Sequence, residues 1–470
     1  MAVAHELSAN DVRVTVLERN PYVGGLAATF EHRGYKFDLG GHRWFTKNED
    51  LNDWFRRLME GELVLVNRIS RIYHDEKYFN YPIRLKEIIS QSHPLTILGI
   101  ATSFLWSSLK QAAVDPPIVT MEQAYTAQFG ASLYRMFFQR YSEKVWGLPC
   151  TKLSADWVAQ RSRGLSIWSL ARDALLGARK DVVSLIDEFM YPRDGYGRIS
   201  ERMAKDVRAK GNDVLLGCDV RKILYHGPGE IDVVYARDGQ EHTLRADNVV
   251  STIPLGRLVL MLEPGCESAV AAAARSLVFR DLITVNVILR KRQVSNDTWL
   301  YIQDGDILFG RMHEPKNWSP AMVADDDHTS LVLECFCSAG DHIWTMSDDA
   351  IGRRCVKDLA EKLHFIEESE VEDILVIRTR GAYPVYDLQY SEKLSIIQNH
   401  LHDRIGLHTV GRGGTFRYNN ADHSIEMGLL LARKLLGDDV DHLTVNTESE
   451  YHEEKRIRAP SANRSARVQR

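Results

Sequence analysis

The sequence predicts an α/β protein with a discontinuous dinucleotide-binding domain, a helical insertion and a second domain built on a mixed β-sheet. The first observation is an alternating apolar run, residues 12–17, that ends at an acidic residue and is followed by paired glycines. The second is helical periodicity over residues 85–185. The third is a return to strand patterning, with a further glycine-rich turn at residues 411–414.

An acidic residue followed by two glycine pairs is the feature on which the predicted nucleotide site depends. Glu18 ends the first strand, where a carboxylate can accept hydrogen bonds from the ribose hydroxyls of a dinucleotide. Gly24–Gly25 and Gly40–Gly41 allow the backbone to approach a ligand closely. Each feature alone is more often a surface acid or an ordinary turn. Their order within one short stretch favours a dinucleotide site.

The start of the chain bears on the phosphate-binding half of that site. A βαβ nucleotide unit opens with a strand and a glycine-rich turn that place a helix N-terminus against the pyrophosphate. Residues 1–7 already have the pattern of that first helix. Either the chain continues upstream or the phosphate-binding turn has been lost. We expect the former, because a sheet without a central strand would expose two unpaired edges.

Composition places the chain among soluble globular proteins of two or three domains. The 470 residues are 44% hydrophobic and 26% charged, and a net charge of −5 gives no reason to expect nucleic acid as a partner. The six scattered cysteines favour reduced thiols in the cytoplasm over a metal site. We expect no transmembrane segment, since the uncharged run at residues 93–109 is too short. That run predicts a buried or partner-facing helix, with a membrane-touching helix as the alternative, and the oligomeric state stays open.

The helical insertion contains two arginines suited to an anionic ligand. Ser154 and Trp157 are typical of a helix start, and the far end of that helix carries Arg161 and Arg163. Guanidinium groups match the geometry of phosphate oxygens. A solvated basic turn explains the composition equally well.

The remaining patterns complete the domain plan. An apolar strand at residues 248–253 returns the chain to the nucleotide domain, which is why that domain is predicted to be discontinuous. The sheet domain is predicted from strands at residues 282–289, 299–302, 307–312, 330–336 and 373–380, with a helix at 348–363. The predicted domains are residues 1–65, 190–254 and 405–446 for nucleotide binding, 85–189 for the helical insertion, 66–84 and 255–404 for the sheet, and 447–470 for a disordered tail.

Several segments resemble the flavoproteins of the amine oxidase and protoporphyrinogen oxidase superfamily. Within it, the closer likeness is to UDP-galactopyranose mutase. The similar segments are Glu18 with Gly24–Gly25, residues 40–45 (GGHRWF), 141–149 (YSEKVWGLP), 153–161, 299–301, 309–311, 382–384, 411–418 (GRGGTFRY) and 422–424. The resemblance implies an FAD-binding Rossmann-like domain, a helical domain that closes over the substrate, and a six-stranded sheet domain.

The same resemblance implies residue roles. Glu18 would hold the adenosine ribose, Arg412 would face the flavin pyrophosphate, and His42 would lie beside the isoalloxazine ring. The implied cofactor-binding residues are Glu18, Arg19, Gly24, Gly25, Gly40, Gly41, His42, Val220, Gly411, Arg412, Asp422 and Ser424. The implied substrate-binding residues are Trp146, Trp157, Arg161, Arg163, Arg311, Tyr383 and Tyr418, and the implied catalytic residues are His42, Arg161, Arg311, Tyr383 and Tyr418.

The implied reaction is ring contraction, or related flavin-mediated chemistry, of a nucleotide-linked sugar in glycan or natural-product biosynthesis. Reduced FAD would displace the nucleoside diphosphate, with NAD(P)H as a candidate external reductant and no metal ion. Gly413–Gly414 and Asn419–Asn420 differ from the residues of galactose mutases, which leaves another sugar nucleotide open as the substrate. The alternatives are an FAD-dependent oxidoreductase of the amine oxidase or desaturase type, with an apolar tunnel, and a flavin-free relative without activity.

Overall fold

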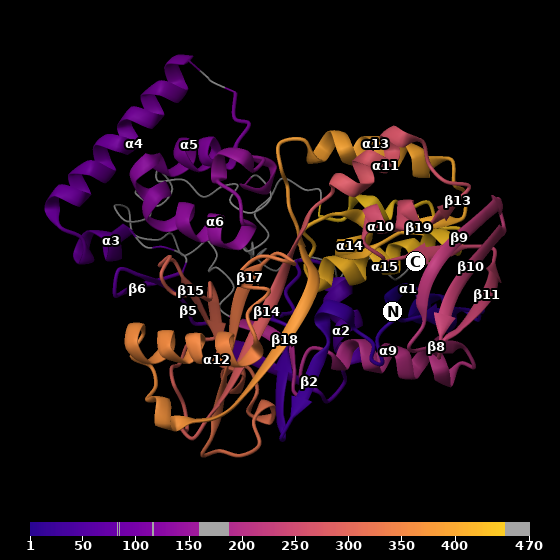
Figure 1. Ribbon diagram of the computed structural model, residues 1–470, viewed down its shortest axis with the longest axis horizontal. Helices are drawn as coiled ribbons and strands as arrows, with labels where there is room; N and C mark the ends of the chain where they lie inside the picture. The colour runs from indigo at the N-terminus through magenta and orange to yellow at the C-terminus, as the bar shows by residue number, and fades with distance from the viewer. Residues whose placement is uncertain (82, 84, 115–116, 159–187, 447–470) are drawn as a thin grey trace, which may run out of the picture.

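The computed structural model describes residues 1–81, 83, 85–114, 117–158 and 188–446. These residues form three parts: an α/β part that holds the N-terminus, a seven-stranded sheet, and a helical part at the upper left of Figure 1. Arg161 and Arg163, and the predicted tail, lie outside the described residues. Among the helices that are described, none is both long and apolar enough to cross a bilayer.

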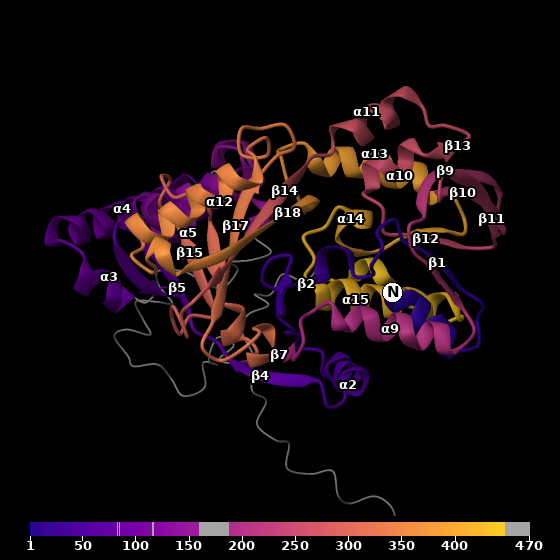
Figure 2. The ribbon, with the colours of Figure 1, turned by 60° about the horizontal axis from the view of Figure 1, so that its bottom comes forward.

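Segments distant in sequence meet in the α/β part, whose main elements are α1 (Ala2–Ala9), β1 (Thr15–Leu17), α9 (Arg198–Ala209), β8 (Asp213–Leu215), β12 (Val249–Ser251), β19 (Leu407–Thr409) and α15 (Ala421–Leu435). β1 pairs with β8, and β12 with β19, both in parallel. α1 packs against α9 and α15 (Figure 2). This assembly confirms the discontinuous α/β fold, although the first strand is shorter than residues 12–17.

A smaller sheet extends the α/β part, with the strand order β11 (Gln240–Ala246), β10 (Glu230–Arg237), β9 (Asp219–Gly227) and β13 (Leu262–Glu263). Three helices pack together nearby: α10 (Leu255–Leu260), α11 (Ser268–Ser276) and α13 (Tyr390–His402). Their apolar faces share a core with Phe416, which follows α14 (Gly411–Thr415). Residues 255–260, 268–276 and 390–402, which the sequence placed in the sheet domain, form these three helices, and residues 262–263 form β13 of the smaller sheet.

A mixed sheet forms the second part, in the order β18 (Val371–Pro384), β14 (Phe279–Leu289), β17 (Thr329–Cys337), β16 (Arg311–His313), β15 (Trp299–Ile302), β5 (Ser70–His74) and β6 (Lys77–Asn80). β15 and β5 are parallel, and the other pairs are antiparallel. The resemblance implied six strands, but the sheet has seven. Two of them are the early hairpin β5–β6, which the sequence had assigned to this domain. The strand expected at 307–312 begins only at Arg311.

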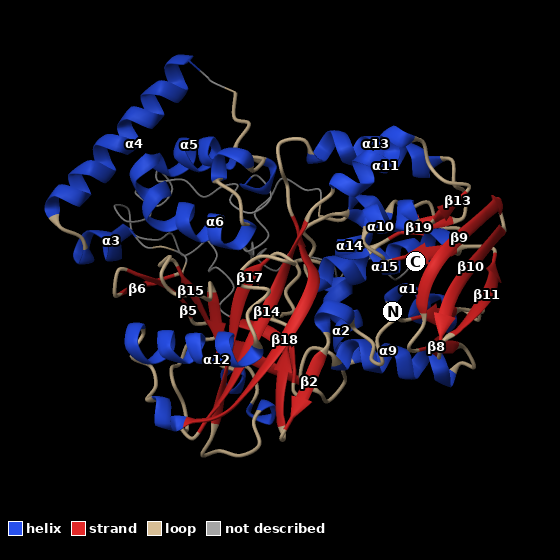
Figure 3. Cartoon of the chain, in the orientation of Figure 1, coloured by secondary structure: helices blue, strands red, loops and turns tan. Residues whose placement is uncertain are grey.

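Both faces of this sheet are covered, so its central strands are buried almost throughout. Every residue of β17 is buried. On one face, α12 (Asp348–Lys357) contributes Ile351 and Cys355 to the core (Figure 3). On the other face, Tyr35 and Phe37 pack near Val332. A polar side chain in these strands is therefore held in a dry environment.

The helical part consists of α3 (Leu85–Gln91), α4 (Pro94–Val114), α5 (Met121–Tyr134), a π-helical turn (Arg135–Gln139) and α6 (Arg140–Trp146). α5 begins at a capping box formed by Thr120 and Gln123. α4 crosses α5 at Gly130, where a Cβ would lie 2.9 Å from the Phe104 Cα. Ile100 and Phe104 of α4 are buried against α5 residues such as Phe129.

Other elements were not expected from the sequence: β2 (Thr29–His32), β3 (Tyr35–Asp38), α2 (Glu49–Leu58), β4 (Leu63–Asn67) and β7 (Glu188–Pro192). β2 pairs with β3, and β4 pairs with β7. The β2–β3 hairpin directly precedes the loop at residues 39–43, which runs from the α/β part towards the large sheet.

Candidate active site

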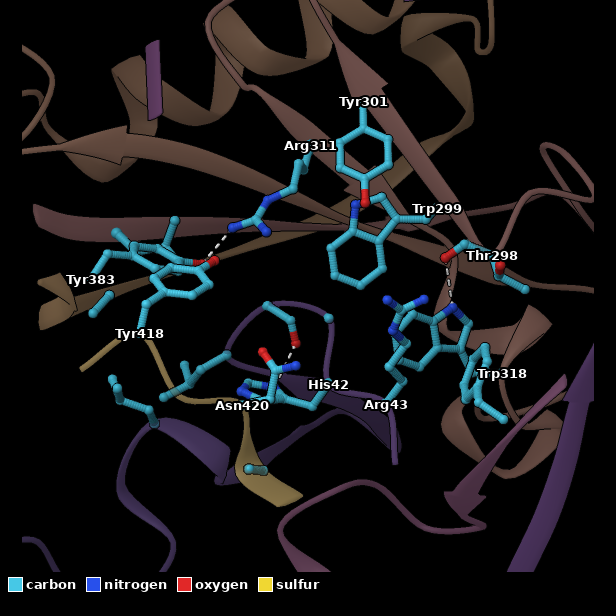
Figure 4. A pocket seen from close by; sticks show the side chains of 18 of the residues that line it. His42, Arg43, Thr298, Trp299, Tyr301, Arg311, Trp318, Tyr383, Tyr418 and Asn420 are labelled. Carbon is cyan, nitrogen blue, oxygen red and sulfur yellow. Dashed lines mark hydrogen bonds between the residues drawn. The ribbon is translucent and has the colours of Figure 1, made fainter. Parts of the chain in front are cut away.

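A cavity of about 130 Å³ lies between the large sheet and two loops of the α/β part (Figure 4). The sheet contributes Trp299 and Tyr301 from β15, Arg311 from β16 and Tyr383 from β18. The loop at residues 39–43 and the segment around Arg412–Ala421 form the facing wall. The cavity therefore collects side chains from regions that are distant in sequence.

Arg311 is held on the cavity wall by a buried carboxylate. Arg311 and Glu334 are directly opposite in the register of β16 and β17. The Arg311 Nη2 lies 2.6 Å from the Glu334 Oε2, and the Arg311 and Glu334 side chains are 12% and 1% exposed. The same Nη2 donates a hydrogen bond to the Tyr383 hydroxyl. Burial alone would lower the pKa of Arg311, but Glu334 and nearby phenols raise it well above the usual range, so Arg311 is a permanent cation.

Two tyrosines and a second arginine form a stack beside Arg311. The rings of Tyr383 and Tyr418 are 5.8 Å apart and nearly parallel. The Arg412 guanidinium lies 5.3 Å from the Tyr383 ring centre and 5.0 Å from that of Tyr418. Its Nε donates to the Asn419 carbonyl at 2.8 Å, and its Nη1 donates to the Ala382 carbonyl at 2.9 Å. These bonds fix the guanidinium in an orientation that exposes part of it to the cavity.

The aromatic wall continues into the helical part. Trp146, at the end of α6, lies 5.7 Å from Tyr418 and 6.4 Å from Tyr383, measured between ring centres. Trp157 lies 6.4 Å from Tyr418. Burial raises the pKa of Tyr383, so its phenol stays protonated at neutral pH. The structure thus groups Trp146 and Trp157 behind the tyrosine pair, as neighbours of the cavity.

His42 lies on the loop that faces the sheet. Its Nδ1 is 3.0 Å from the Gly40 carbonyl oxygen, which can only accept, so the neutral ring carries its proton on Nδ1 and leaves Nε2 as an acceptor. Burial, with Arg412 and Arg311 nearby, lowers the pKa of His42 to about 4. His42 is therefore neutral at physiological pH.

The backbone of this loop is pressed against the sheet at Gly41. A Cβ at Gly41 would lie 1.9 Å from a carbon of the Trp299 ring, and Gly40 has φ +93°. The Gly41 amide donates to the Glu334 Oε1 at 3.4 Å. Both glycines therefore allow the close contact between the loop and the sheet, and their predicted role in binding the cofactor stays a prediction.

The expected cofactor residues fall into two groups. Gly40, Gly41, His42 and Arg412 line the cavity. The rest lie in the α/β part, outside the cavity lining: Glu18, Arg19, Gly24, Gly25, Val220, Gly411, Asp422 and Ser424.

Glu18 and Gly411 each lie just beyond the end of a parallel strand. Glu18 follows β1, and its carboxylate accepts from the Asn20 amide at 2.7 Å. Gly411 follows β19 at φ +75°, and a Cβ there would meet no atom within 4 Å, as at Gly25. Both residues thus follow the carboxyl ends of parallel strands, where ligands of such sheets bind, and open space remains at the backbone.

Sequence reasoning missed Glu334, Arg43 and Arg68. Glu334 is the only charged residue of β17, and a lone carboxylate within an apolar strand was a usable signal. Arg43 directly follows His42 and lines the cavity, as does Arg68 before β5. Nothing in the sequence indicated Arg68, because its position depends on how the early hairpin joins the sheet.

Known proteins with similar sequences point to flavoenzymes. Residues 1–391 match the family described as flavin-containing amine oxidoreductase. A Klebsiella pneumoniae protein named Probable UDP-galactopyranose mutase is 26% identical over 161 residues, which is 33% of this chain. The chain spans about 40% of the length of that curated relative.

Solved structures share the fold at lower identity. Reduced UDP-galactopyranose mutase superposes with a TM-score of 0.81 at 20% identity, covering 95% of each chain. Cyclohexylamine oxidase from Brevibacterium oxydans IH-35A gives a TM-score of 0.62 at 16% identity, covering 92% of this chain and 95% of that one. The family match covers most of the sequence, residues 1–391. The chain belongs to the flavin-containing amine oxidoreductase family.

Proposed function

We propose that this flavoenzyme acts on a nucleotide-linked sugar by mutase-like chemistry. The observation that carries the proposal is the pair of guanidinium groups, Arg311 and Arg412, that face one cavity. Among the described residues that line the cavity, none is Asp or Glu. Such a cavity attracts an anionic substrate such as a nucleoside diphosphate and repels a protonated amine.

Arg311 is suited to stabilise a departing diphosphate. Negative charge increases on the phosphate oxygens as the bond to the sugar breaks, and a fixed cation lowers the barrier where that charge develops. Glu334 and Tyr383 hold the guanidinium in place before the substrate arrives. The substrate-side roles of Tyr418, Trp146 and Trp157 are proposed on the same basis, as are those of Arg161 and Arg163, which the structure does not describe.

His42 contributes an uncharged acceptor on the opposite wall. The Nδ1–H···O=C bond to Gly40 leaves the Nε2 lone pair available. Because the pKa of His42 is lowered to about 4, this atom can accept a proton or a hydroxyl hydrogen bond at neutral pH. A protonated imidazole would add a further cation to a cavity already lined by four arginines, without offering an acceptor.

The residues present fit FAD at two places. Glu18 and Gly411, beside open space at the ends of parallel strands, would hold the dinucleotide. Gly40, His42 and Arg412 would face the ring, which supplies electrons to the substrate or accepts a hydride from it. NAD(P)H is proposed as the external reductant, and a cytoplasmic location remains part of the proposal.

An amine oxidase-like hydride transfer is the second candidate, favoured by the family match. The apolar tunnel expected for it was assigned to residues 95–109. None of these residues lines the described cavity. This distribution favours the nucleotide sugar.

The test is an assay without net oxidation. Flavin-loaded protein, reduced with dithionite or NADPH, is mixed with UDP-hexoses and UDP-uronic acids, and the products are separated by chromatography. We expect an isomeric nucleotide sugar from one of these substrates. Arg311→Lys should lower kcat/KM by about 10²-fold or more, with flavin content unchanged.

The matched control is Arg245→Lys. Arg245, on β11, is exposed and forms an ion pair with Asp232 on the neighbouring strand β10, and neither residue lines the cavity. This variant should leave turnover unchanged. Absence of isomerisation, together with hydrogen peroxide release from amines, would replace the mutase proposal with the oxidoreductase candidate.

A further inference from the structure

α4 carries a row of exposed apolar side chains along its outer face. Leu95, Leu98, Leu105, Trp106 and Leu109 are between 53% and 72% exposed. The opposite face, with Ile100 and Phe104, is buried against α5. Aligned apolar side chains exposed to this degree mark an interaction surface. In Figure 1, α4 forms the outer edge of the helical part.

The spacing of the row indicates that its partner is another helix. Leu95, Leu98, Thr102, Leu105 and Leu109 follow the i, i+3, i+7, i+10, i+14 pattern of a heptad seam. Helices that repeat apolar residues every 3.5 residues pack by inserting knobs into the holes of a facing helix. A helix that needed only to cover its own domain would not carry this second, outward seam.

The polar residue in the seam is already satisfied. The Thr102 hydroxyl donates to the carbonyl oxygens of Leu98 at 2.9 Å and Gly99 at 3.2 Å within its own helix. Covering Thr102 therefore leaves no hydroxyl without a partner. Its methyl group remains available for packing at the middle of the seam.

Charge argues against a lipid surface as the partner. No Lys, Arg, Asp or Glu occurs between Glu87 and Lys110, so the flanks of the seam are uncharged. Helices that lie on membranes carry Lys and Arg on their polar face. Here that face is occupied by the contact with α5.

We infer that α4 binds α4 of a second copy of this chain across a two-fold axis. Most soluble homo-oligomers use one surface patch twice in this way. Thr102 lies midway between Leu95 and Leu109, so antiparallel helices crossing at Thr102 would place Leu95 of each copy against Leu109 of the other. The opposed helix dipoles of that arrangement are also favourable.

The area is sufficient for a specific dimer. Each Leu or Trp that moves from exposed to buried removes on the order of 100 Å² of apolar surface from water. Five such side chains from each copy bury about 1,000 Å² in total, at the lower end of specific interfaces. We therefore expect a dimer that dissociates on dilution.

The first test measures molar mass by light scattering across a dilution series. The full chain should give twice its 53.6 kDa at high concentration. The double variant Leu98→Glu/Leu105→Glu should give a single-chain mass with an unchanged circular dichroism spectrum and unfolding temperature. The control Thr96→Glu adds a charge to an exposed position of α4 outside the seam and should remain dimeric.

The second test locates the axis. Thr102→Cys should form a covalent dimer under mild oxidation, whereas Thr96→Cys should not. Background cross-linking is limited because five native cysteines are buried and Cys266 is half-buried. A single-chain mass at every concentration would overturn the proposal, as would a dimer that survives Leu98→Glu/Leu105→Glu. Binding of a single-chain species to phosphatidylcholine vesicles would also overturn it, in favour of a lipid partner.

Discussion

The Lys144 ammonium group lies 2.6 Å from the Asp304 carbonyl oxygen, inside the loop that connects β15 to β16. It is also 3.0 Å from the carbonyl oxygen of Ile307 and 3.3 Å from that of Phe309. Burial lowers the pKa of Lys144 to about 8. A cation from α6 thus organises the backbone that leads into Arg311, and it joins the helical part to the large sheet.

Replacing Lys144 by Met should loosen this loop. The carbonyl groups around the ammonium would lose their donor while staying buried, so we expect the free energy of unfolding to fall by about 2–3 kcal/mol. Urea unfolding followed by tryptophan fluorescence measures this change. The control is Lys152→Met, an exposed lysine of the same segment, which should stay within about 0.5 kcal/mol of the parent. Equal effects of the two substitutions would contradict this role of Lys144.

The Arg311–Glu334 pair should be strongly coupled. Glu334→Gln leaves a buried guanidinium without its counter-ion and should destabilise the fold by about 3 kcal/mol or more. Arg311→Met leaves the carboxylate unpaired, with a similar cost. The double variant should be more stable than the sum of the two effects predicts, because neither charge then remains. A double-mutant cycle in urea tests this, and additive effects would argue against the pairing.

These buried pairs show how far sequence patterns predict the fold and the site. Strand and helix patterns predicted the two sheets and the insertion, because each element carries its own periodicity. Short segments that resemble known flavoproteins singled out His42, Arg311, Tyr383, Arg412 and Tyr418, all of which line the cavity, while their roles stay predictions. Glu334 acts through the register of β16 and β17, and Lys144 through a contact between separate parts. Such long-range contacts have no local signature.

Gly41→Ala should disturb the cavity through Trp299. The added methyl would overlap the indole ring, so either the ring or the loop carrying His42 must move. Overpacking of this kind costs about 1–3 kcal/mol, and we expect an increased KM together with a lower unfolding temperature. Gly41→Ala/Trp299→Leu should recover the stability. Gly305→Ala, where a Cβ would meet no atom within 4 Å, is the matched control. Unchanged stability in Gly41→Ala would rule out the close contact.

The pH dependence of activity should reflect a neutral His42. Its pKa is lowered to about 4, so the acid limb of kcat/KM should lie near pH 4 and not near the ordinary value of about 6.5. The ¹H–¹³C signal of the His42 ring, assigned with His42→Gln, measures the titration directly. A midpoint near 6.5 would show that the two arginines do not act on this ring.

The pKa of Asp38 is shifted upwards, in contrast to that of His42, so the contribution of Asp38 to stability should fall as pH rises. The Asp38 carboxylate accepts hydrogen bonds from the Thr29 hydroxyl at 2.6 Å, the Tyr191 hydroxyl at 2.7 Å and the Tyr196 amide at 3.1 Å. These hydrogen bonds join β3, which carries Asp38, to β2 and β7 next to the His42 loop. Burial raises its pKa from 3.8 to about 6, despite these hydrogen bonds. The folded state therefore binds the proton more tightly than the unfolded state between these values.

The contribution of Asp38 to stability is therefore fully present below pH 3.8 and is lost as pH rises through 6. Asp38→Asn removes this titration. The free energy of unfolding of the variant, relative to that of the parent, should rise by up to roughly 3 kcal/mol between pH 4 and pH 7. Urea unfolding of both proteins at several pH values gives this difference. The control is Asp194→Asn, at a half-buried neighbour whose pKa is lowered by Lys36. Its difference from the parent should change little between pH 4 and pH 7, and should change in the reverse direction only below the ordinary pKa of 3.8. A pH-independent difference for Asp38→Asn would mean that the carboxylate stays ionised throughout.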